Sequence, residues 1–299
     1  KAMLEKNITL YDHEVITDPR GNRLIGFGRY AGLVGAYNGF RALGMKAQSF
    51  SLPKAEHLAD LPALIAELNS INLPAIKILL TGTGKVAKGA KEILDAMNIK
   101  SVSISAYLTE SFDEPVYCKI DVLDYNKRID GQVLTNSDFY NNPSAYVSNF
   151  MRFAKVTDYF IAGHFFGDGS PYLFTREDAK SDKFNIRLVA DISCDIDGPV
   201  ASTLRASTIA DPIYGYDPET STEVAYTSSD AITVMAVDNL PCELPKDASD
   251  GFGDLFLTHV IPAFFNGDKD GILARAAMTN AQELTPRYEY LQGYVNGEE

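Results

Sequence analysis

Residues 75–89, Ala-Ile-Lys-Ile-Leu-Leu-Thr-Gly-Thr-Gly-Lys-Val-Ala-Lys-Gly, carry the pattern that decides the fold. An apolar run ends at Gly82, Gly84 follows after one residue, and a helical pattern begins at once. A strand, a glycine turn and a helix in this order form the usual cradle for the diphosphate of a dinucleotide. Glycines let the chain turn tightly and approach phosphates, and the helix presents free N–H groups to the anion. The stretch predicts a dinucleotide site at Gly82, Thr83, Gly84, Lys85 and Val86, with an ordinary turn between strand and helix as the alternative.

Strands and helices alternate on both sides of this stretch. Helical patterns cover residues 30–43, 58–68, 85–97 and 143–155, and short apolar runs typical of buried strands cover 76–80, 101–104, 116–120, 159–162, 186–192 and 231–237. Such alternation predicts an α/β fold with a Rossmann-like parallel sheet, which we expect over residues 30–250. Residues 1–29, with short strands at 8–14 and 24–27, are expected to be the remnant of an N-terminal catalytic domain. The tail, 251–299, is expected to return to it and make a second, incomplete α/β domain.

Composition limits the classes of partner. The chain has 299 residues and a formal net charge of −13, which argues against nucleic acid and anionic membrane surfaces. No apolar stretch approaches membrane-spanning length, and three widely spaced cysteines suit a reducing cytoplasm. We therefore expect a cytoplasmic protein with a small-molecule substrate; the residues do not fix the oligomeric state, and a homo-oligomer is compatible with them. The chain begins at Lys1 without a methionine, so we expect a fragment whose upstream residues are missing.

Polar residues stand near the ends of the predicted strands. In open α/β sheets, ligands bind beyond the carboxyl ends of the strands, so these side chains are expected to converge on one crevice. Turn formation is the alternative for the aspartates, and a structural loop histidine is the alternative for His164. The residues placed there are Thr83, Ser105, His164, Asp191, Asp195, Asp238 and Asn239.

Five stretches carry a family resemblance. They are residues 8–14 (ITLYDHE), 26–32 (GFGRYAG), 81–86 (TGTGKV), 191–198 (DISCDIDG) and 235–245 (MAVDNLPCELP), followed by Ala248-Ser249. In these residues the chain resembles the lysine–2-oxoglutarate reductase branch of the saccharopine dehydrogenases, which is related to alanine dehydrogenase and to the NAD-binding subunit of transhydrogenase. The resemblance runs in order from about residue 8 to residue 260. It implies hydride transfer between a nicotinamide cofactor and the imine that joins lysine to 2-oxoglutarate.

The resemblance also implies roles for individual residues. Asp195 falls where alanine dehydrogenases carry a catalytic aspartate. Asp238 with Asn239 is expected beside the nicotinamide and the reacting centre, which makes Asp238 a second catalytic candidate. Arg23 aligns with an arginine near the dicarboxylate substrate, and Arg29 is a neighbouring candidate; a surface ion pair is the alternative for both. The family's acid–base lysine and histidine belong to a segment expected upstream of Lys1, so the chain as given is expected to bind cofactor without turnover.

Cofactor choice and reaction stay open between alternatives. NAD sites usually place an acid after the second strand, but residues 103–107 contain none, which tilts the prediction slightly from NAD toward NADP. An alanine dehydrogenase or other opine-type dehydrogenase is the rival enzyme, and a non-catalytic NAD(P)-binding regulatory module is the rival from another class. No metal is predicted: His13, His57 and His259 lack ligand spacing, and the EF-hand-like run from Asn266 has Ala277 where a glutamate is required.

Overall fold

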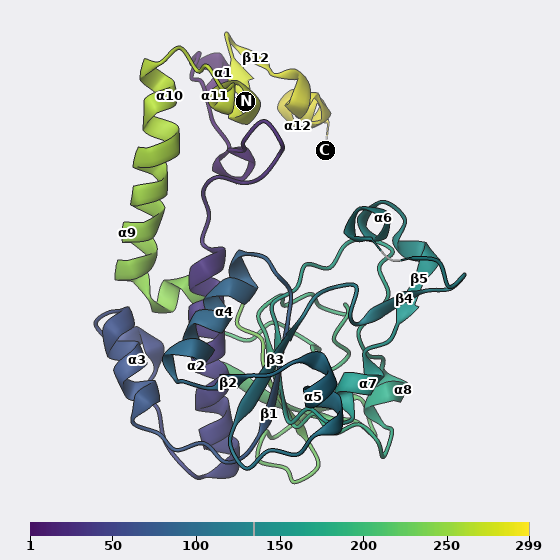
Figure 1. Cartoon of the computed structure of the whole chain (residues 1–299). Coiled ribbons are helices and arrows are strands. Elements are labelled where there is room, and N and C mark those ends of the chain that lie inside the picture. The colour runs from purple at the N-terminus through teal and green to yellow at the C-terminus, as the bar shows by residue number, and fades with distance from the viewer. Residues whose placement is uncertain (134, 299) are drawn as a thin grey trace. The chain divides into compact units, whose positions relative to one another are not determined.

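The computed structural model describes residues 1–133 and 135–298 (Figure 1). The chain divides into two compact units. One unit joins Lys1–Phe27 to Ala248–Glu299, and the other comprises Gly28–Asp247. Each unit is described by itself below.

The larger unit is built on an eight-stranded sheet with the order β2-β3-β1-β6-β7-β10-β8-β9. The first six strands in this order run parallel, and β8 and β9 continue the sheet antiparallel. Their bounds are β1 (Lys77–Thr81), β2 (Lys100–Ser101), β3 (Val116–Ile120), β6 (Tyr159–Ala162), β7 (Leu188–Asp191), β8 (Ile213–Asp217), β9 (Thr222–Val224) and β10 (Ile232–Met235). The central parallel strands are apolar along nearly their whole length because both faces of the sheet are covered. The predicted α/β fold with a parallel sheet is confirmed.

The strand register aligns the carboxyl ends of the central strands. Thr81 pairs with Ile120 on one side and with Ala162 on the other, and Ala162 pairs with Asp191. The last residues of β3, β1, β6 and β7 therefore lie in one row, and the loops that follow them leave the same edge of the sheet.

Seven helices accompany the described part of this sheet: α2 (Gly28–Ala47), α3 (Leu61–Asn69), α4 (Lys85–Ala96), α5 (Ile104–Thr109), α6 (Asn136–Asn141), α7 (Met151–Ala154) and α8 (Arg176–Ala179). Helices α2 and α4 cross closely through glycines. A Cβ at Gly32 would lie 2.0 Å from the carbonyl oxygen of Val86, and one at Gly89 would lie 2.1 Å from that of Arg29. Residues larger than glycine at these two positions would force the helices apart.

Two predicted elements of this unit are wrong. The helix expected over 143–155 is divided, because β5 (Tyr146–Ser148) leaves the helical path to pair antiparallel with β4 (Asn126–Arg128). The strand expected over 101–104 ends at Ser101, because the Ser103 hydroxyl accepts a hydrogen bond from the N–H of Ala106 and starts α5. A capping box formed by Thr175 and Asp178 begins α8.

The smaller unit is mostly helical. Its elements are α1 (Ala2–Glu5), the continuation of α9 (Pro245–Leu255), a π-helical turn (Phe256–Val260), α10 (Ile261–Phe265), α11 (Ile272–Ala276), β11 (Thr279–Asn280), β12 (Glu283–Leu284) and α12 (Gln292–Asn296). The strands expected over 8–14 and 24–27 are wrong. The first segment has a single bridge, Tyr11 with Ala277, and then enters a 3-10 turn at His13–Val15, and residues 24–27 are bends and irregular chain. The π-helical turn ends just before Pro262, which has no N–H to continue the regular ladder.

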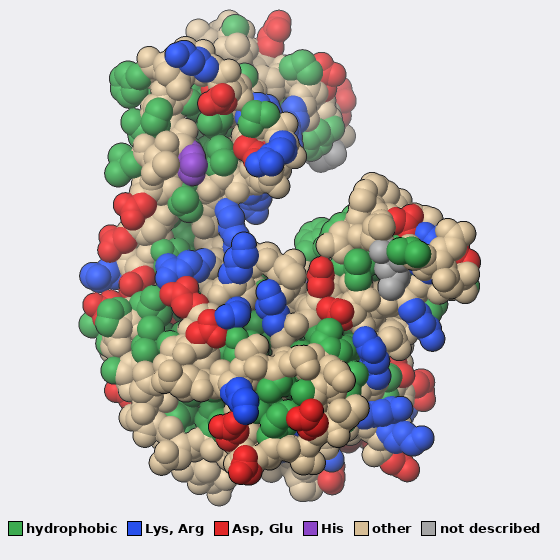
Figure 2. Space-filling view, in the orientation of Figure 1, with side chains coloured by type: hydrophobic (Ala, Val, Ile, Leu, Met, Phe, Trp, Pro, Cys, Tyr) green, Lys and Arg blue, Asp and Glu red, His purple; other side chains and the backbone are tan. Residues whose placement is uncertain are grey.

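Charges are mixed on the molecular surface. Figure 2 shows acidic and basic side chains interspersed over the face in view, so the net charge of −13 does not collect there into one acidic patch. Within the described residues, every helix is too short or too polar to cross a lipid bilayer.

Candidate functional site

The glycine turn after β1 has an open side at a helix N-terminus. Gly82 has a φ of +103°, and a Cβ there would lie 2.5 Å from the carbonyl oxygen of Gly163, so this position requires glycine. Gly84 is the N-cap of α4, where no side chain caps the helix, and a Cβ at Gly84 would meet no atom within 4 Å. Thr83, Gly84 and Lys85 are exposed. Uncapped N–H groups facing free space suit a diphosphate, so the turn fits the group that its sequence predicts.

Hydrogen bonds connect the neighbouring strand ends. The N–H of Gly82 donates to the carbonyl of Ile120 at 3.0 Å, which joins the turn to the end of β3. On the other side, the Ser193 hydroxyl donates to the carbonyl of His164 at 2.7 Å. The thiol of Cys194 donates to the carbonyl of Ala236 at 3.1 Å. The structure thus brings together the loops that carry Gly82, His164, Asp191 and Asp195 with the segment leading to Asp238.

His164 is buried beneath the glycine turn. Its Nδ1 lies 2.8 Å from the hydroxyl of Thr81, and its Nε2 is buried without a hydrogen-bond partner. Burial lowers the pKa of His164 to about 4, so the imidazole is neutral near pH 7. A neutral, sequestered ring supports the turn from below; its contact with a cofactor stays a prediction.

Asp191 is buried at the end of β7, and its two oxygens are already engaged. Oδ2 accepts a hydrogen bond from the Thr203 hydroxyl at 2.6 Å, and Oδ1 accepts one from the N–H of Cys194 at 3.1 Å. Burial raises the pKa of Asp191 to about 6, although these two donors oppose the rise. The observed contacts give Asp191 a structural role, and its contact with a cofactor stays a prediction.

The other acidic candidates are more accessible. Asp195 is partly buried, and burial raises its pKa. It opens a turn closed by the N–H of Gly198, which donates to the Asp195 carbonyl at 3.1 Å. Asp238 and Asn239 are exposed directly after the extended segment that continues β10. These three side chains are accessible, and their chemical roles stay predictions.

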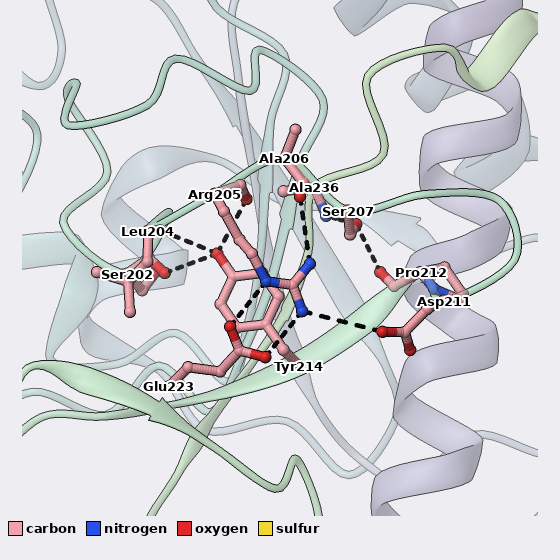
Figure 3. Close-up of polar contacts among 10 residues, drawn as sticks. All are labelled: Ser202, Leu204, Arg205, Ala206, Ser207, Asp211, Pro212, Tyr214, Glu223 and Ala236. Carbon is pink, nitrogen blue, oxygen red and sulfur yellow. Dashed lines mark hydrogen bonds and ion pairs between the residues drawn. The ribbon is translucent and has the colours of Figure 1, made fainter.

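Residues 200–212 form a segment that buttresses two strand ends. Thr203 binds Asp191, and Ser207 binds the backbone of Ala236 in both directions, at 2.8 and 3.1 Å. Figure 3 shows how Arg205 fixes this segment: its guanidinium lies over the ring of Tyr214 and makes two bonds to Glu223, at 2.7 and 2.8 Å. The antiparallel strands β8 and β9 therefore hold the loop that supports the end of β7.

The two predicted substrate arginines are both paired. Arg29 makes a two-pronged ion pair with Glu92 of α4, at 2.6 and 2.9 Å, and this hydrogen bonding raises the pKa of Arg29. The pair joins α2 to α4, which is the surface ion pair that the sequence left as the alternative. Arg23 lies in the smaller unit and pairs with Glu14. Substrate contact by either arginine stays a prediction.

The structure removes the basis for Ser105 and identifies an acid that the sequence reading missed. Ser105 is exposed in α5, and β2 ends where Ser101 pairs with Tyr117, well before the end of β3 at Ile120. The strand beside β1 is β3, although β2 precedes it in the chain. Asp121 follows β3 directly, next to the glycine turn, which is where NAD sites place their acidic residue. The absence of an acid at 103–107 therefore says nothing about the cofactor, and the tilt toward NADP loses its reason.

The sheet order, the glycine turn and the row of strand ends define a Rossmann-like α/β domain. In fold the chain is similar to a solved L-alanine dehydrogenase, with a TM-score of 0.58 at 15% identity, over 98% of this chain and 70% of that one. No family model matches the chain.

The sequence is also similar to enzymes named as semialdehyde synthases and saccharopine dehydrogenases. The chain is 27% identical to alpha-aminoadipic semialdehyde synthase from Arabidopsis thaliana, over 97% of this chain and 31% of the relative. The mitochondrial protein of that name from Rattus norvegicus is 25% identical, over 97% of this chain and 36% of the relative. Saccharopine dehydrogenase [NAD(+), L-lysine-forming] from Candida glabrata is 24% identical, over 90% and 67%. The chain thus spans about a third of the first two relatives, and the resemblance to saccharopine dehydrogenases is confirmed.

Two predictions are not supported by these names. The Candida glabrata relative is named for NAD+, which gives the tilt toward NADP no support. The rat relative is named as mitochondrial, so a cytoplasmic location for this chain stays a prediction.

Proposed function

We propose that the chain binds NAD(H) and forms the dinucleotide-binding part of an amino acid dehydrogenase of the saccharopine type. The observation that carries the proposal is the open, uncapped N-terminus of α4 at Gly84, with Asp121 at the end of the neighbouring strand β3. The relatives named as saccharopine dehydrogenases and semialdehyde synthases support an oxidoreductase acting on a CH–NH group.

Different residues around the glycine turn would bind different parts of the cofactor. The N–H groups that open α4 would hold the diphosphate, and Gly84 would let it approach the backbone. The Asp121 carboxylate, next to the turn, would accept a hydrogen bond from the ribose 2′-hydroxyl of the adenosine half. The loops after β6, β7 and β10 would then border the nicotinamide half. When bound, the nicotinamide ring supplies or accepts a hydride.

Residues near the nicotinamide half would prepare the reacting group. Asp238 and Asn239 are exposed and can contact a ligand, and Asp195 can hold a protonated partner or orient a water molecule. Asp191 and His164 would act only through the loops that they support. The substrate of this proposal is the lysine–2-oxoglutarate imine, or saccharopine in the reverse direction.

Binding and turnover test the proposal separately. Titration of the chain with NADH should give saturable binding, and protein that is folded but binds neither NADH nor NADPH would overturn the proposal. Turnover is assayed on the protein expressed from the first codon of its gene, with lysine plus 2-oxoglutarate against pyruvate plus ammonia. Preference for the first pair is expected. Preference for the second would make the protein an alanine dehydrogenase, and binding without any turnover would make it a cofactor-binding module.

A further inference from the structure

Helix α2 lies against the segments that follow β7 and β10. A Cβ at Gly35 would lie 2.5 Å from Cγ1 of Ile192, in the loop after β7, and 3.2 Å from Cδ1 of Leu240, in the segment after β10. One turn further along α2, the side chain of Asn38 reaches the segment after β10 as well. Helix α2 therefore contacts two of the loops that would border the nicotinamide half of the cofactor.

The contact of Asn38 is a buried hydrogen bond to a carboxyl group. Its Nδ2 donates to Oε1 of Glu243 at 2.7 Å, and each of the two side chains is only 3% exposed. Burial raises the pKa of Glu243, and the hydrogen bond from Asn38 opposes that rise. Because a buried polar atom that loses its partner is costly, this bond ties Glu243 to the helix.

Glu243 ends a short turn that follows two of the candidate site residues. The 3-10 turn Leu240–Glu243 begins directly after Asn239, which is its N-cap. Leu240 and Glu243 are buried, whereas Asp238 and Asn239 are exposed. We call Asp238 and Asn239 the exposed dipeptide. Its two side chains are accessible because the turn that follows them carries the buried contacts.

The exposed dipeptide lies between two anchors. On its amino side, Ser207 bonds to the backbone of Ala236 in both directions, at 2.8 and 3.1 Å (Figure 3). On its carboxyl side, Glu243 bonds to Asn38 of α2. Both anchors are close to the exposed dipeptide in the sequence, so together they define its path. Loss of either bond would leave the backbone between them freer to move.

We propose that Glu243, held by Asn38, is a positioning residue that fixes the exposed dipeptide for contact with the nicotinamide half of the dinucleotide. The inference rests on the proposed cofactor function. The carboxyl group of Glu243 is buried against α2, so its effect on the ligand would pass through the exposed dipeptide. A loop that is already ordered loses less conformational entropy when the ligand binds, and its contacts therefore contribute more to affinity. The stretch 235–245 carries the family resemblance, but none of the roles expected from it falls on Glu243.

Two ligands distinguish the halves of the dinucleotide site. NADH has both halves, whereas ADP-ribose has the adenosine and the diphosphate but lacks the nicotinamide. Calorimetric titration of the chain gives a dissociation constant for each, and wild-type protein should bind NADH more tightly than ADP-ribose. Asn38→Ala should weaken NADH at least about threefold and change the affinity for ADP-ribose less than about 1.5-fold. Glu243→Gln keeps an acceptor for the Asn38 amide and should retain most of the NADH affinity.

Asn185→Ala is the matched control. Asn185 also donates from its Nδ2 to a carboxylate, Oδ1 of Asp158, at 3.1 Å. These two residues precede β7 and β6, at the opposite edge of the sheet from the glycine turn. The control should therefore leave the ratio of the two dissociation constants unchanged. If Asn38→Ala does not fold, Asn38→Ser, which is too short to reach Glu243, is judged by the same ratio.

The outcomes distinguish this inference from the proposed function. Folded wild-type protein that binds neither NADH nor ADP-ribose overturns the proposed function. Wild-type protein that binds both, with a ratio that is the same in Asn38→Ala as in Asn185→Ala, overturns the positioning role alone. Equal affinity of the wild type for the two ligands also overturns it, because the nicotinamide then gains nothing from its contacts. A general loss of stability would weaken both ligands together, so a change in their ratio reports positioning.

Discussion

Replacement of Gly84 by alanine should separate cofactor affinity from stability. Gly84 has a φ of −76°, which any residue adopts, and its Cβ would meet no protein atom within 4 Å. Alanine is a poorer N-cap than glycine by roughly 0.5–1 kcal/mol. The smaller entropy of the unfolded chain offsets about 0.4–1 kcal/mol of that loss. The free energy of unfolding should therefore change by less than about 1 kcal/mol.

The same methyl group would stand where the diphosphate has to rest. We expect the dissociation constant for NADH to rise at least about tenfold, which corresponds to about 1.4 kcal/mol. Calorimetric titration measures the affinity, and urea denaturation measures the stability. Gly32→Ala is the control with the opposite signature: its Cβ would lie 2.0 Å from the Val86 carbonyl oxygen. That overpacking should cost about 1–3 kcal/mol of stability. If Gly84→Ala binds NADH as tightly as the wild type, the diphosphate does not bind at Gly84 and the reasoning is refuted.

Burial raises the pKa of Asp191 from 3.8 to about 6, so the folded protein favours the protonated carboxyl. The contribution of this group to stability is therefore full below about pH 4 and is lost as pH rises to about 6, a loss of roughly 3 kcal/mol. Asp191→Asn cannot titrate and removes this loss. Urea denaturation should show the free energy of unfolding of the variant rising relative to that of the wild type between about pH 4 and 6. Parallel pH profiles for the two proteins would contradict this prediction. Burial lowers the pKa of His164 from 6.5 to about 4, so the wild type loses stability as pH falls through that range, and His164→Gln should lose less. Arg205→Met should cost about 1 kcal/mol, because the pair with Glu223 is partly exposed. A double-mutant cycle with Glu223→Gln measures that coupling, and additive losses would show that the pair contributes nothing.

The sheet was largely predictable because its central strands are buried on both faces. The strands expected at 116–120 and 159–162 have the bounds that the structure gives to β3 and β6, and β1 is displaced by one residue from the expected 76–80. Continuous apolar runs bounded by glycine or polar residues leave little ambiguity about such strands. The glycine turn was predictable because its signal is local: Gly82 needs a positive φ, and the residues that mark the turn are adjacent in the sequence.

The predictions that failed depend on pairing between segments that are distant in the sequence. No local signal shows that Tyr146–Ser148 leaves a helical pattern to pair with Asn126–Arg128. Asp121 was missed because the strand next to β1 is the third in the chain, and strand order is set by packing across the whole sheet. Ser105 was misplaced by the same assumption, together with the unrecognised cap at Ser103. The tilt toward NADP, which nothing in the structure supports, therefore rested on one error of topology.

Titration of the purified chain with NADH tests most directly the central claim, that the glycine turn after β1 binds the diphosphate of NAD(H). The account predicts saturable binding that is weakened by Gly84→Ala and by Asp121→Ala, and weaker binding of NADPH to the wild-type protein. A natively folded chain that gives no binding signal with NADH would contradict it, as would binding that is indifferent to both substitutions.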